Sequence, residues 1–255
     1  MFVHGLLVNS ELWTGVADEL AARGVRSYAL DLPLGAHSIA LRPDADLTPR
    51  GIARLIIGFL DELDLTDVTL VGSDTGSALC QFVIDTDDTR IGRLLLTNGD
   101  AFEQFPPPSF APVLKICRYP VGVYTLMSVM RPAGIRQRIQ NQNVAKPLDP
   151  ALTRRWIAPA LADRGVRRDT AKVMRGIDPA ELVEVSKRLR RFTKPVVLLW
   201  GDADQFFPID LAHRLRDAFA DARLVQVPGG RLFFPLDEPR RVADEIQAVL
   251  HPEGR

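Results

Sequence analysis

The sequence predicts an α/β domain in which helices cover a mostly parallel β-sheet. Three observations support this prediction. Strand-like and helix-like segments alternate at both ends of the 255-residue chain, as they do where helices connect parallel strands. The alternation stops at residues 101–191, where several helical patterns follow a run of three prolines. A glycine-flanked turn at residues 72–76 joins a buried strand directly to a helix.

Each element follows from its own local pattern. β-Branched and apolar runs predict strands at residues 1–3, 25–32, 67–73, 91–98, 196–200 and 222–227. Apolar residues at helical spacing predict helices at residues 11–23, 49–63, 76–84, 209–220 and 239–250. We therefore expect residues 1–100 and 192–255 to form one core. Residues 101–191 are expected to form a helical cap (lid) over the carboxyl edge of the sheet.

The charge of the chain is balanced, with 32 Lys and Arg against 32 Asp and Glu, and so gives no indication of nucleic-acid binding. Residues 101–194 nevertheless hold 18 basic and 7 acidic residues. A basic cap would attract an anionic small molecule to a pocket. A solvated arginine-rich surface, pairing between cap and core, or pairing between the subunits of a homodimer explains the same excess.

Cysteine usage and hydropathy predict a cytoplasmic protein that does not enter a membrane. Cys80 and Cys117 lie in apolar surroundings without the spacing of metal ligands, so we expect buried, reduced thiols, no metal and no cofactor. No basic and apolar leader precedes the first strand. No run of about 18 uncharged apolar residues occurs either.

The turn Gly72-Ser73-Asp74-Thr75-Gly76 has the pattern of a nucleophile elbow. In such a turn the attacking residue has strained backbone dihedrals, and the flanking positions are glycines because side chains would collide with the neighbouring strand and helix. The strand before it and the helix after it are the context that the motif requires. Asp74 is the candidate nucleophile, and an ordinary loop with Asp74 as N-cap is the alternative.

Two further segments supply candidate partners for Asp74. After the first strand, the turn His4-Gly5-Leu6 offers the backbone N–H of Leu6, which with the N–H of Thr75 would form an oxyanion hole. His4 itself is expected to hold this turn by hydrogen bonds. Asp204 follows the strand at residues 196–200, where the orienting acid of a catalytic triad belongs, and Asp202 is expected to form the turn.

These motifs, in this order, resemble the α/β-hydrolase superfamily. The aspartate in the elbow is similar to that of the haloalkane dehalogenase and epoxide hydrolase branch, and the resemblance covers nearly the whole chain. It implies an α/β-hydrolase fold with a cap, and an alkyl ester on Asp74 that is hydrolysed by water. In that family a histidine activates the water.

The chain departs from the family where this histidine belongs. The family places it seven residues before a proline, here Pro239, and the residue at that position is Leu232. No histidine occurs from residue 214 to residue 250. His37 lies at the correct edge of the sheet and is a candidate for a displaced base, whereas His213 lies within a predicted helix and His251 in the terminal tail.

Other family features are also changed. Thr75 stands where dehalogenases of this branch commonly have a tryptophan. Tyr119 and Tyr124 are candidates for the cap tyrosines of epoxide hydrolases, with core packing as the alternative. The first strand begins three residues before the His-Gly turn, so that either the sheet edge is trimmed or the start codon was placed late. The further candidates for the pocket lining are His4, Asn9, Trp13, His37 and Phe233.

The missing histidine leaves three functions open. Asp74 attacks as an ionised carboxylate, so a small-molecule hydrolase could still form its ester and then stall, because water needs a base. The second possible function is that of a ligand-binding protein without catalytic activity. The third possible function is that of a lyase, isomerase or cyclase. There, burial and repulsion between Asp74 and Asp204 would leave one of them protonated near neutral pH, as an acid or base.

Overall fold

The computed structural model describes residues 1–250, and its five strands form one parallel sheet in the order β1-β2-β3-β4-β5. The strands are β1 (Phe2–Val3), β2 (Val68–Asp74), β3 (Ile91–Gly99), β4 (Val196–Gly201) and β5 (Ala222–Val227). The register between β2 and β3 shifts between Gly72 and Asp74, at the carboxyl end of β2. All carboxyl ends lie at one edge, which therefore collects the residues that follow each strand.

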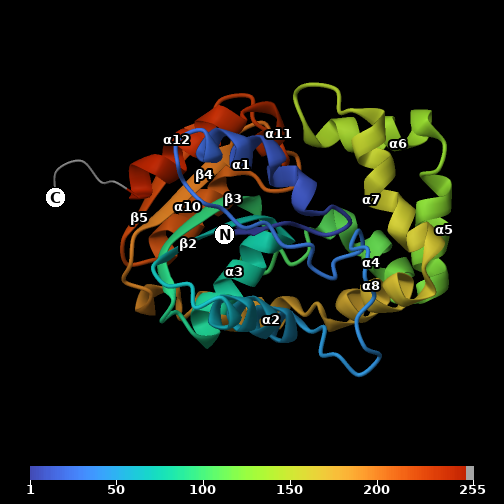
Figure 1. Cartoon of the computed structure of the whole chain (residues 1–255), viewed down its shortest axis with the longest axis horizontal. Coiled ribbons are helices and arrows are strands. Elements are labelled where there is room, and N and C mark those ends of the chain that lie inside the picture. The colour runs from blue at the N-terminus through green and yellow to red at the C-terminus, as the bar shows by residue number, and fades with distance from the viewer. Residues whose placement is uncertain (251–255) are drawn as a thin grey trace.

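Helices cover the sheet and extend beyond one side of it (Figure 1). In Figure 1, α1, α11 and α12 lie above the sheet and α2 and α3 lie below it. The helices that accompany the sheet are α1 (Thr14–Ala21), α2 (Pro49–Glu62), α3 (Thr75–Thr86), α10 (Ile209–Ala218), α11 (Phe234–Asp237) and α12 (Pro239–Leu250). The α/β-hydrolase fold predicted from the sequence is confirmed.

A group of helices between β3 and β4 occupies the right-hand side of Figure 1, beside the sheet. They are α4 (Ala111–Cys117), α5 (Pro120–Val129), α6 (Ala133–Gln140), α7 (Pro150–Ala162) and α8 (Arg164–Gly176). The group ends with α9 (Pro179–Ser186), which packs against α3 instead. Short 3-10 helices occur at Ser10–Trp13, Pro108–Phe110, Asn141–Asn143 and Leu189–Arg191. No helix within residues 1–250 has the length and hydropathy needed to cross a membrane.

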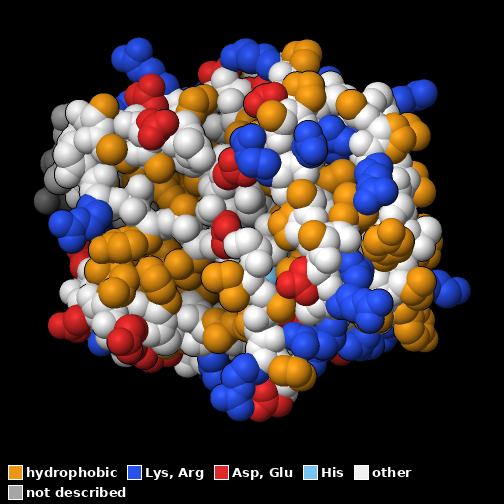
Figure 2. Space-filling model, turned by 45° about the vertical axis from the view of Figure 1, so that its right-hand side comes forward, with side chains coloured by type: hydrophobic (Ala, Val, Ile, Leu, Met, Phe, Trp, Pro, Cys, Tyr) orange, Lys and Arg blue, Asp and Glu red, His pale blue; other side chains and the backbone are white. Residues whose placement is uncertain are grey.

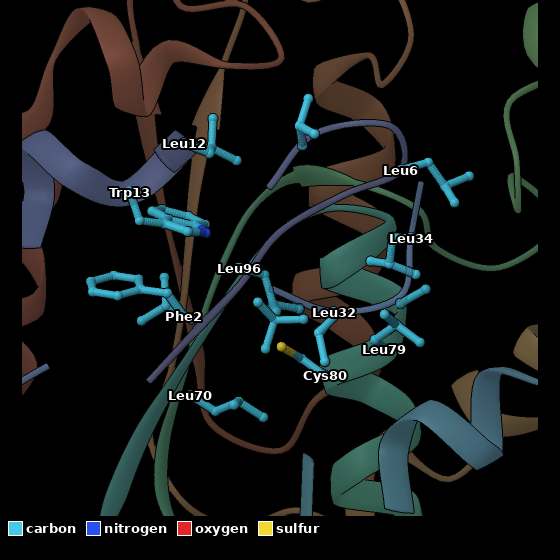
Figure 3. Close-up of a cluster of buried hydrophobic side chains, with 14 of the residues drawn as sticks. Phe2, Leu6, Leu12, Trp13, Leu32, Leu34, Leu70, Leu79, Cys80 and Leu96 are labelled. Carbon is cyan, nitrogen blue, oxygen red and sulfur yellow. The ribbon is translucent and has the colours of Figure 1, made fainter. Parts of the chain in front are cut away.

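The hydrophobic core lies between the sheet and its helices, and Figure 3 shows its central part. Phe2 and Trp13 stack with ring centroids 4.9 Å apart, which joins β1 to the first helical turn. Leu70 and Leu96, on β2 and β3, are fully buried, as are Leu79 and Cys80 on α3. This packing fixes β2 and α3 relative to each other, and Asp74 lies at their junction.

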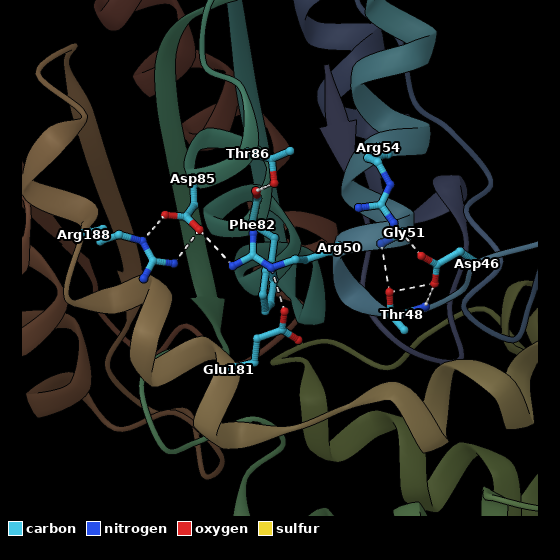
Figure 4. Close-up of polar contacts among 10 residues, drawn as sticks. All are labelled: Asp46, Thr48, Arg50, Gly51, Arg54, Phe82, Asp85, Thr86, Glu181 and Arg188. Atoms are coloured by element: carbon cyan, nitrogen blue, oxygen red, sulfur yellow. Dashed lines mark hydrogen bonds and ion pairs between the residues drawn. The ribbon is translucent and has the colours of Figure 1, made fainter.

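An ion-pair network joins three helices below the sheet (Figure 4). Asp85 in α3 accepts from Arg50 of α2 at 3.0 Å and from Arg188 at 2.6 Å. Arg50 also pairs with Glu181 of α9 at 2.7 Å. The two arginines lower the pKa of Asp85 despite its partial burial. The network therefore connects the end of the helix group to the core.

The predicted strand at residues 25–32 is wrong in extent. Only one bridge forms there, between Ala29 and Phe2, and Phe2 N–H donates to Tyr28 O at 2.7 Å. Its partner in this bridge is β1, which consists only of Phe2 and Val3, so that the ladder between the two segments is short. Cys80 and Cys117 are buried and unbonded, as predicted.

Candidate functional site

Asp74 lies at a sharp turn between β2 and α3, with φ 56° and ψ −130°. A non-glycine residue rarely has a positive φ, and the contacts on both sides hold this one in place. A Cβ on Gly76 would lie 2.3 Å from Val3 O, and one on Gly72 would lie 2.6 Å from Gly76 O. The two glycines therefore let α3 approach β1 and β2 closely enough to form the turn.

We expect Gly76→Ala to lower the free energy of unfolding by about 1–3 kcal/mol, the usual cost of overpacking. Gly58→Ala is the matched control, because Gly58 lies exposed within α2 and an added Cβ meets nothing within 4 Å. That variant should gain about 0.5–1 kcal/mol from helix propensity. Urea unfolding of both variants measures the difference. An unchanged stability of Gly76→Ala would contradict the close approach described above.

The carboxylate of Asp74 is held by backbone N–H groups. Leu6 N–H donates to Asp74 Oδ2 at 3.1 Å, and a Cβ on Gly5 would lie 2.1 Å from the same oxygen. Burial raises the pKa of Asp74 to about 7, and the charge of Asp204 adds to the rise. Hydrogen bonds from the backbone of Leu6 and Thr75 oppose it. Burial therefore favours the protonated form of Asp74 at a pH where an exposed aspartate is fully ionised.

A second carboxyl group, Asp100, lies behind this turn and was missed by the sequence prediction. It follows β3 directly and is fully buried. Thr75 Oγ1 donates to Asp100 Oδ2 at 2.9 Å, and Asp100 N–H donates to Asp74 O at 3.2 Å. Burial, and then the charge of Asp74, raise the pKa of Asp100 well above its usual value. The signal was available, because Asp100 follows a strand end just as Asp204 does.

Asp204 follows β4, as predicted, and lies in the turn beyond it. Its Oδ1 accepts from Phe206 N–H at 2.8 Å, and its Oδ2 is buried without a hydrogen-bond partner among the described residues. Burial raises the pKa of Asp204 to about 6. Asn98 fixes the adjoining strand ends, because its side chain exchanges hydrogen bonds of 2.6 and 2.9 Å with Gly201.

A cavity of about 320 Å³ opens above Asp74. Apolar side chains dominate its lining, and they come from the loops after β1, β3, β4 and β5 and from α4, α5 and α6. The polar residues in the lining are Asp74, Thr75, Ser109, Gln140, Gln142 and Asn143. Within residues 1–250, no group of His, Cys, Asp and Glu side chains is arranged to hold a metal ion.

Leu232, at the position of the family histidine, lines this cavity together with Asp74 and Phe233. None of the lining residues is a histidine. His37 Nε2 lies 3.6 Å from Asp169 Oδ2 instead, and burial lowers the pKa of this histidine. His213 lies in α10, and His251 lies outside the described residues. His37 is therefore not part of the cavity lining, and its ring packs against α8.

Residues 1–245 match the sequence profile of the alpha/beta hydrolase family. The chain belongs to this family. Among curated relatives, a 2-hydroxy-6-oxononadienedioate/2-hydroxy-6-oxononatrienedioate hydrolase from Cupriavidus pinatubonensis is 26% identical over 231 residues, which are 88% of this chain and 76% of the relative. A hydrolase of the same name from Paraburkholderia xenovorans is also 26% identical, over the same shares of the two chains.

Solved structures show the same α/β-hydrolase fold. An alpha/beta hydrolase fold protein from Burkholderia ambifaria has a TM-score of 0.77 and 22% identity, over 96% of this chain and 88% of that one. A haloalkane dehalogenase from Bradyrhizobium elkani has a TM-score of 0.74 and 18% identity, over 98% and 89%. At this identity the likeness concerns the fold alone.

Several other predicted pocket residues lie away from the cavity of this α/β hydrolase. His4 is buried, and burial lowers its pKa to about 4. Its Nδ1 is hydrogen-bonded to Gly5 O at 2.9 Å, and its Nε2 accepts a hydrogen bond from Leu32 N–H at 2.9 Å. It therefore holds the turn as an uncharged ring, the role first expected of it. Asn9 accepts from Trp156 Nε1 at 2.9 Å and so joins the loop after β1 to α7, while Trp13 stacks on Phe2 within the core.

The two tyrosines of the helix group also point elsewhere. Tyr119 is 66% exposed and Tyr124 is 42% exposed, and neither lines the cavity. The guanidinium of Arg167 lies 5.2 Å from the centroid of the Tyr124 ring. This cation–π contact holds the ring at the surface. These side chains face solvent because each helix turns its other side towards its neighbours.

The basic residues of the helix group do not line the cavity. Many lie on the outer surface of the group, and Arg136 is buried within it. Figure 2 shows Lys and Arg side chains scattered over the outside of the molecule, many on the right-hand half. None of the residues that line the cavity is Lys or Arg. Arg155 instead pairs with Glu11 at 2.7 Å, and Arg188 pairs with Asp85 at 2.6 Å. Ion pairs between the helix group and the core thus neutralise part of the excess positive charge of the helix group.

Proposed function

We propose that this α/β hydrolase acts on small, apolar organic molecules and that Asp74 is its nucleophile. The observation that carries the proposal is the placement of Asp74. It is the only Asp, Glu, His, Lys or Arg side chain in the lining of an apolar cavity, and it sits at a strained strand-to-helix turn. Its Oδ2 accepts a hydrogen bond from Leu6 N–H, so this N–H points at the carboxyl group. That direction supports the proposed oxyanion hole of Leu6 and Thr75.

The proposed chemistry has two steps. A carboxylate oxygen of Asp74 attacks an electrophilic carbon, a C–O bond forms, and the bond from that carbon to the leaving group breaks. Water then adds to the carboxyl carbon of the resulting ester, and the negative oxygen formed there is stabilised by the N–H groups of Leu6 and Thr75. Breakdown releases an alcohol and restores Asp74. No histidine takes the proton of water in the second step, because Leu232 stands at that position.

The cavity favours a neutral substrate. Its volume of about 320 Å³ suits a small molecule, and its lining offers only amides and hydroxyls besides Asp74. The curated relatives are named for hydrolysis of dioates, which carry two carboxylates. A cavity without Lys or Arg does not suit such a substrate, nor the anionic ligand that the basic helix group first suggested.

Incubation with short 1-bromoalkanes and with terminal epoxides tests the proposal. We expect one alkyl adduct per chain in the intact mass, and peptide mapping should place it on Asp74. Decay of the adduct over time should release the alcohol or diol. Binding of these probes without any adduct or product would contradict the proposed nucleophile and would favour the ligand-binding alternative.

One observation supports a second candidate function. The pKa of Asp74 is raised to about 7 by burial, a value suited to a general acid or base in an isomerase, lyase or cyclase. Such an enzyme would convert its substrate with no covalent intermediate. Exchange of a substrate C–H proton with deuterated water, without an adduct, would favour this candidate.

A further inference from the structure

The proposed ester on Asp74 needs a proton acceptor for its hydrolysis, and the cavity lining contains no obvious one. Besides Asp74 itself, the lining holds no Asp, Glu, His, Lys or Arg side chain. Asp204 is not among the lining residues, and His37 packs against Asp169. The acceptor must therefore be reached through a residue that does line the cavity. This inference rests on the proposed function.

Thr75 is that residue. It directly follows Asp74 and lines the same cavity. Its hydroxyl donates a hydrogen bond to Asp100 Oδ2 at 2.9 Å. A hydroxyl that donates inward keeps its lone pairs free to accept a proton from the cavity side. Asp100 lies wholly beneath the turn, where solvent does not reach it. The pair thus links a residue of the cavity lining to a buried carboxylate.

We propose that Thr75 and Asp100 together replace the missing histidine, with Thr75 relaying a proton from the attacking water to Asp100. In this step the water oxygen forms a bond to the carboxyl carbon of the Asp74 ester. The water O–H proton passes to Thr75 Oγ1, and the proton already on Thr75 Oγ1 passes to Asp100 Oδ2. When the tetrahedral intermediate collapses, the proton returns by the same route to the departing alkoxide, which leaves as the alcohol.

The surroundings of Asp100 make its carboxylate a strong proton acceptor. Thr75 is the only side chain that donates to it, and Asp100 Oδ1 is buried without a partner among the described residues. Burial and the charge of Asp74 both raise the pKa of Asp100. Alkylation converts Asp74 into an uncharged ester and removes the second cause. Asp100 then ionises more readily at the stage that requires a base.

The attack of Asp74 on the substrate does not use this relay, so the two steps should respond differently to mutation. Asp100→Asn removes the acceptor and keeps the shape of the side chain. Thr75→Val removes the hydroxyl and keeps its volume, whereas Thr75→Ser retains the hydroxyl and serves as the matched control. Each variant is loaded with excess 1-bromohexane, freed from the reagent and followed by intact mass at mildly alkaline pH.

We expect all three variants and the unmodified protein to form the adduct at rates within a few-fold of one another. Adduct decay should slow by about 10²-fold or more in Asp100→Asn and Thr75→Val, the usual contribution of a general base. Thr75→Ser should decay within a few-fold of the unmodified protein. A purely structural role for these residues would slow adduct formation and decay together.

Three results would overturn the relay. If the adduct decays equally fast in Asp100→Asn and in the unmodified protein, the relay is excluded and Asp74 remains the nucleophile. If the adduct of the unmodified protein never decays, the relay is also excluded and Asp74 again remains the nucleophile. The absence of any adduct would contradict the nucleophile itself, and the relay with it. If Asp100→Asn does not fold, the comparison of Thr75→Val with Thr75→Ser decides the question.

Discussion

Replacing Asp74 with asparagine is expected to abolish adduct formation with bromoalkanes and epoxides. The amide oxygen is a far weaker nucleophile than a carboxylate, while the side chain keeps its shape and still accepts the N–H of Leu6. Asparagine also tolerates the positive φ of this position better than other side chains, so the turn should persist. Intact mass after incubation measures the loss. An adduct on Asp74→Asn would show that another group reacts.

The same variant should be more stable than the unmodified protein at alkaline pH. Burial raises the pKa of Asp74 from 3.8 to about 7, so the folded chain holds a proton that the unfolded chain has released. The contribution of Asp74 to stability is therefore most favourable below about pH 4 and becomes less favourable as the pH rises towards 7. Asparagine carries no such proton. Urea unfolding should show a gain for Asp74→Asn that grows over this interval, and a gain independent of pH would contradict the raised pKa.

Leu232→His is expected to accelerate adduct decay by about 10²–10⁴-fold, the range for a positioned general base. Leu232 lines the cavity with Asp74, so an imidazole placed there can reach the ester carbon through one water molecule. The decay rate should increase as the imidazole loses its proton near its usual pKa of about 6.5. The formation of the adduct should change little, because attack by Asp74 does not use the histidine.

Leu232→Gln is the control for this substitution, since it brings a polar side chain of similar size that cannot take a proton near neutral pH. Its adduct should decay about as slowly as that of the unmodified protein. Equal acceleration by glutamine and histidine would indicate that Leu232 acts only by excluding water. No acceleration by histidine would mean that the remaining site cannot orient a base.

The motifs near strand ends could be predicted because they depend on local backbone requirements. The glycines around Asp74 are needed wherever a strand turns sharply into a helix, and Asp204 follows a strand whose position is set by its apolar run. Leu232 was placed by its spacing to Pro239, and the structure brings it to the cavity that Asp74 lines. In these cases neighbours along the chain determine the position.

The cavity lining of the helix group could not be predicted in the same way. Tyr119 and Tyr124 face solvent, whereas Gln140 and Asn143 line the cavity, and these directions depend on how α5 and α6 pack. Helical spacing shows which residues share a face but not which neighbour that face meets. Asp100 could be placed at a strand end from the sequence, as Asp204 was, but its contacts could not. Its importance comes from contact with Thr75, 25 residues earlier in the chain.

The fate of the water oxygen tests the central claim, that Asp74 forms an ester which water hydrolyses at its carboxyl carbon, most directly. The loaded protein is transferred into water enriched in oxygen-18, and after the adduct decays the peptide containing Asp74 is analysed by mass spectrometry. Hydrolysis at the carboxyl carbon predicts that the heavy oxygen appears in the side chain of Asp74 and that the released alcohol is unlabelled. A labelled alcohol with an unlabelled Asp74 would contradict this account, because water would then have attacked the alkyl carbon directly.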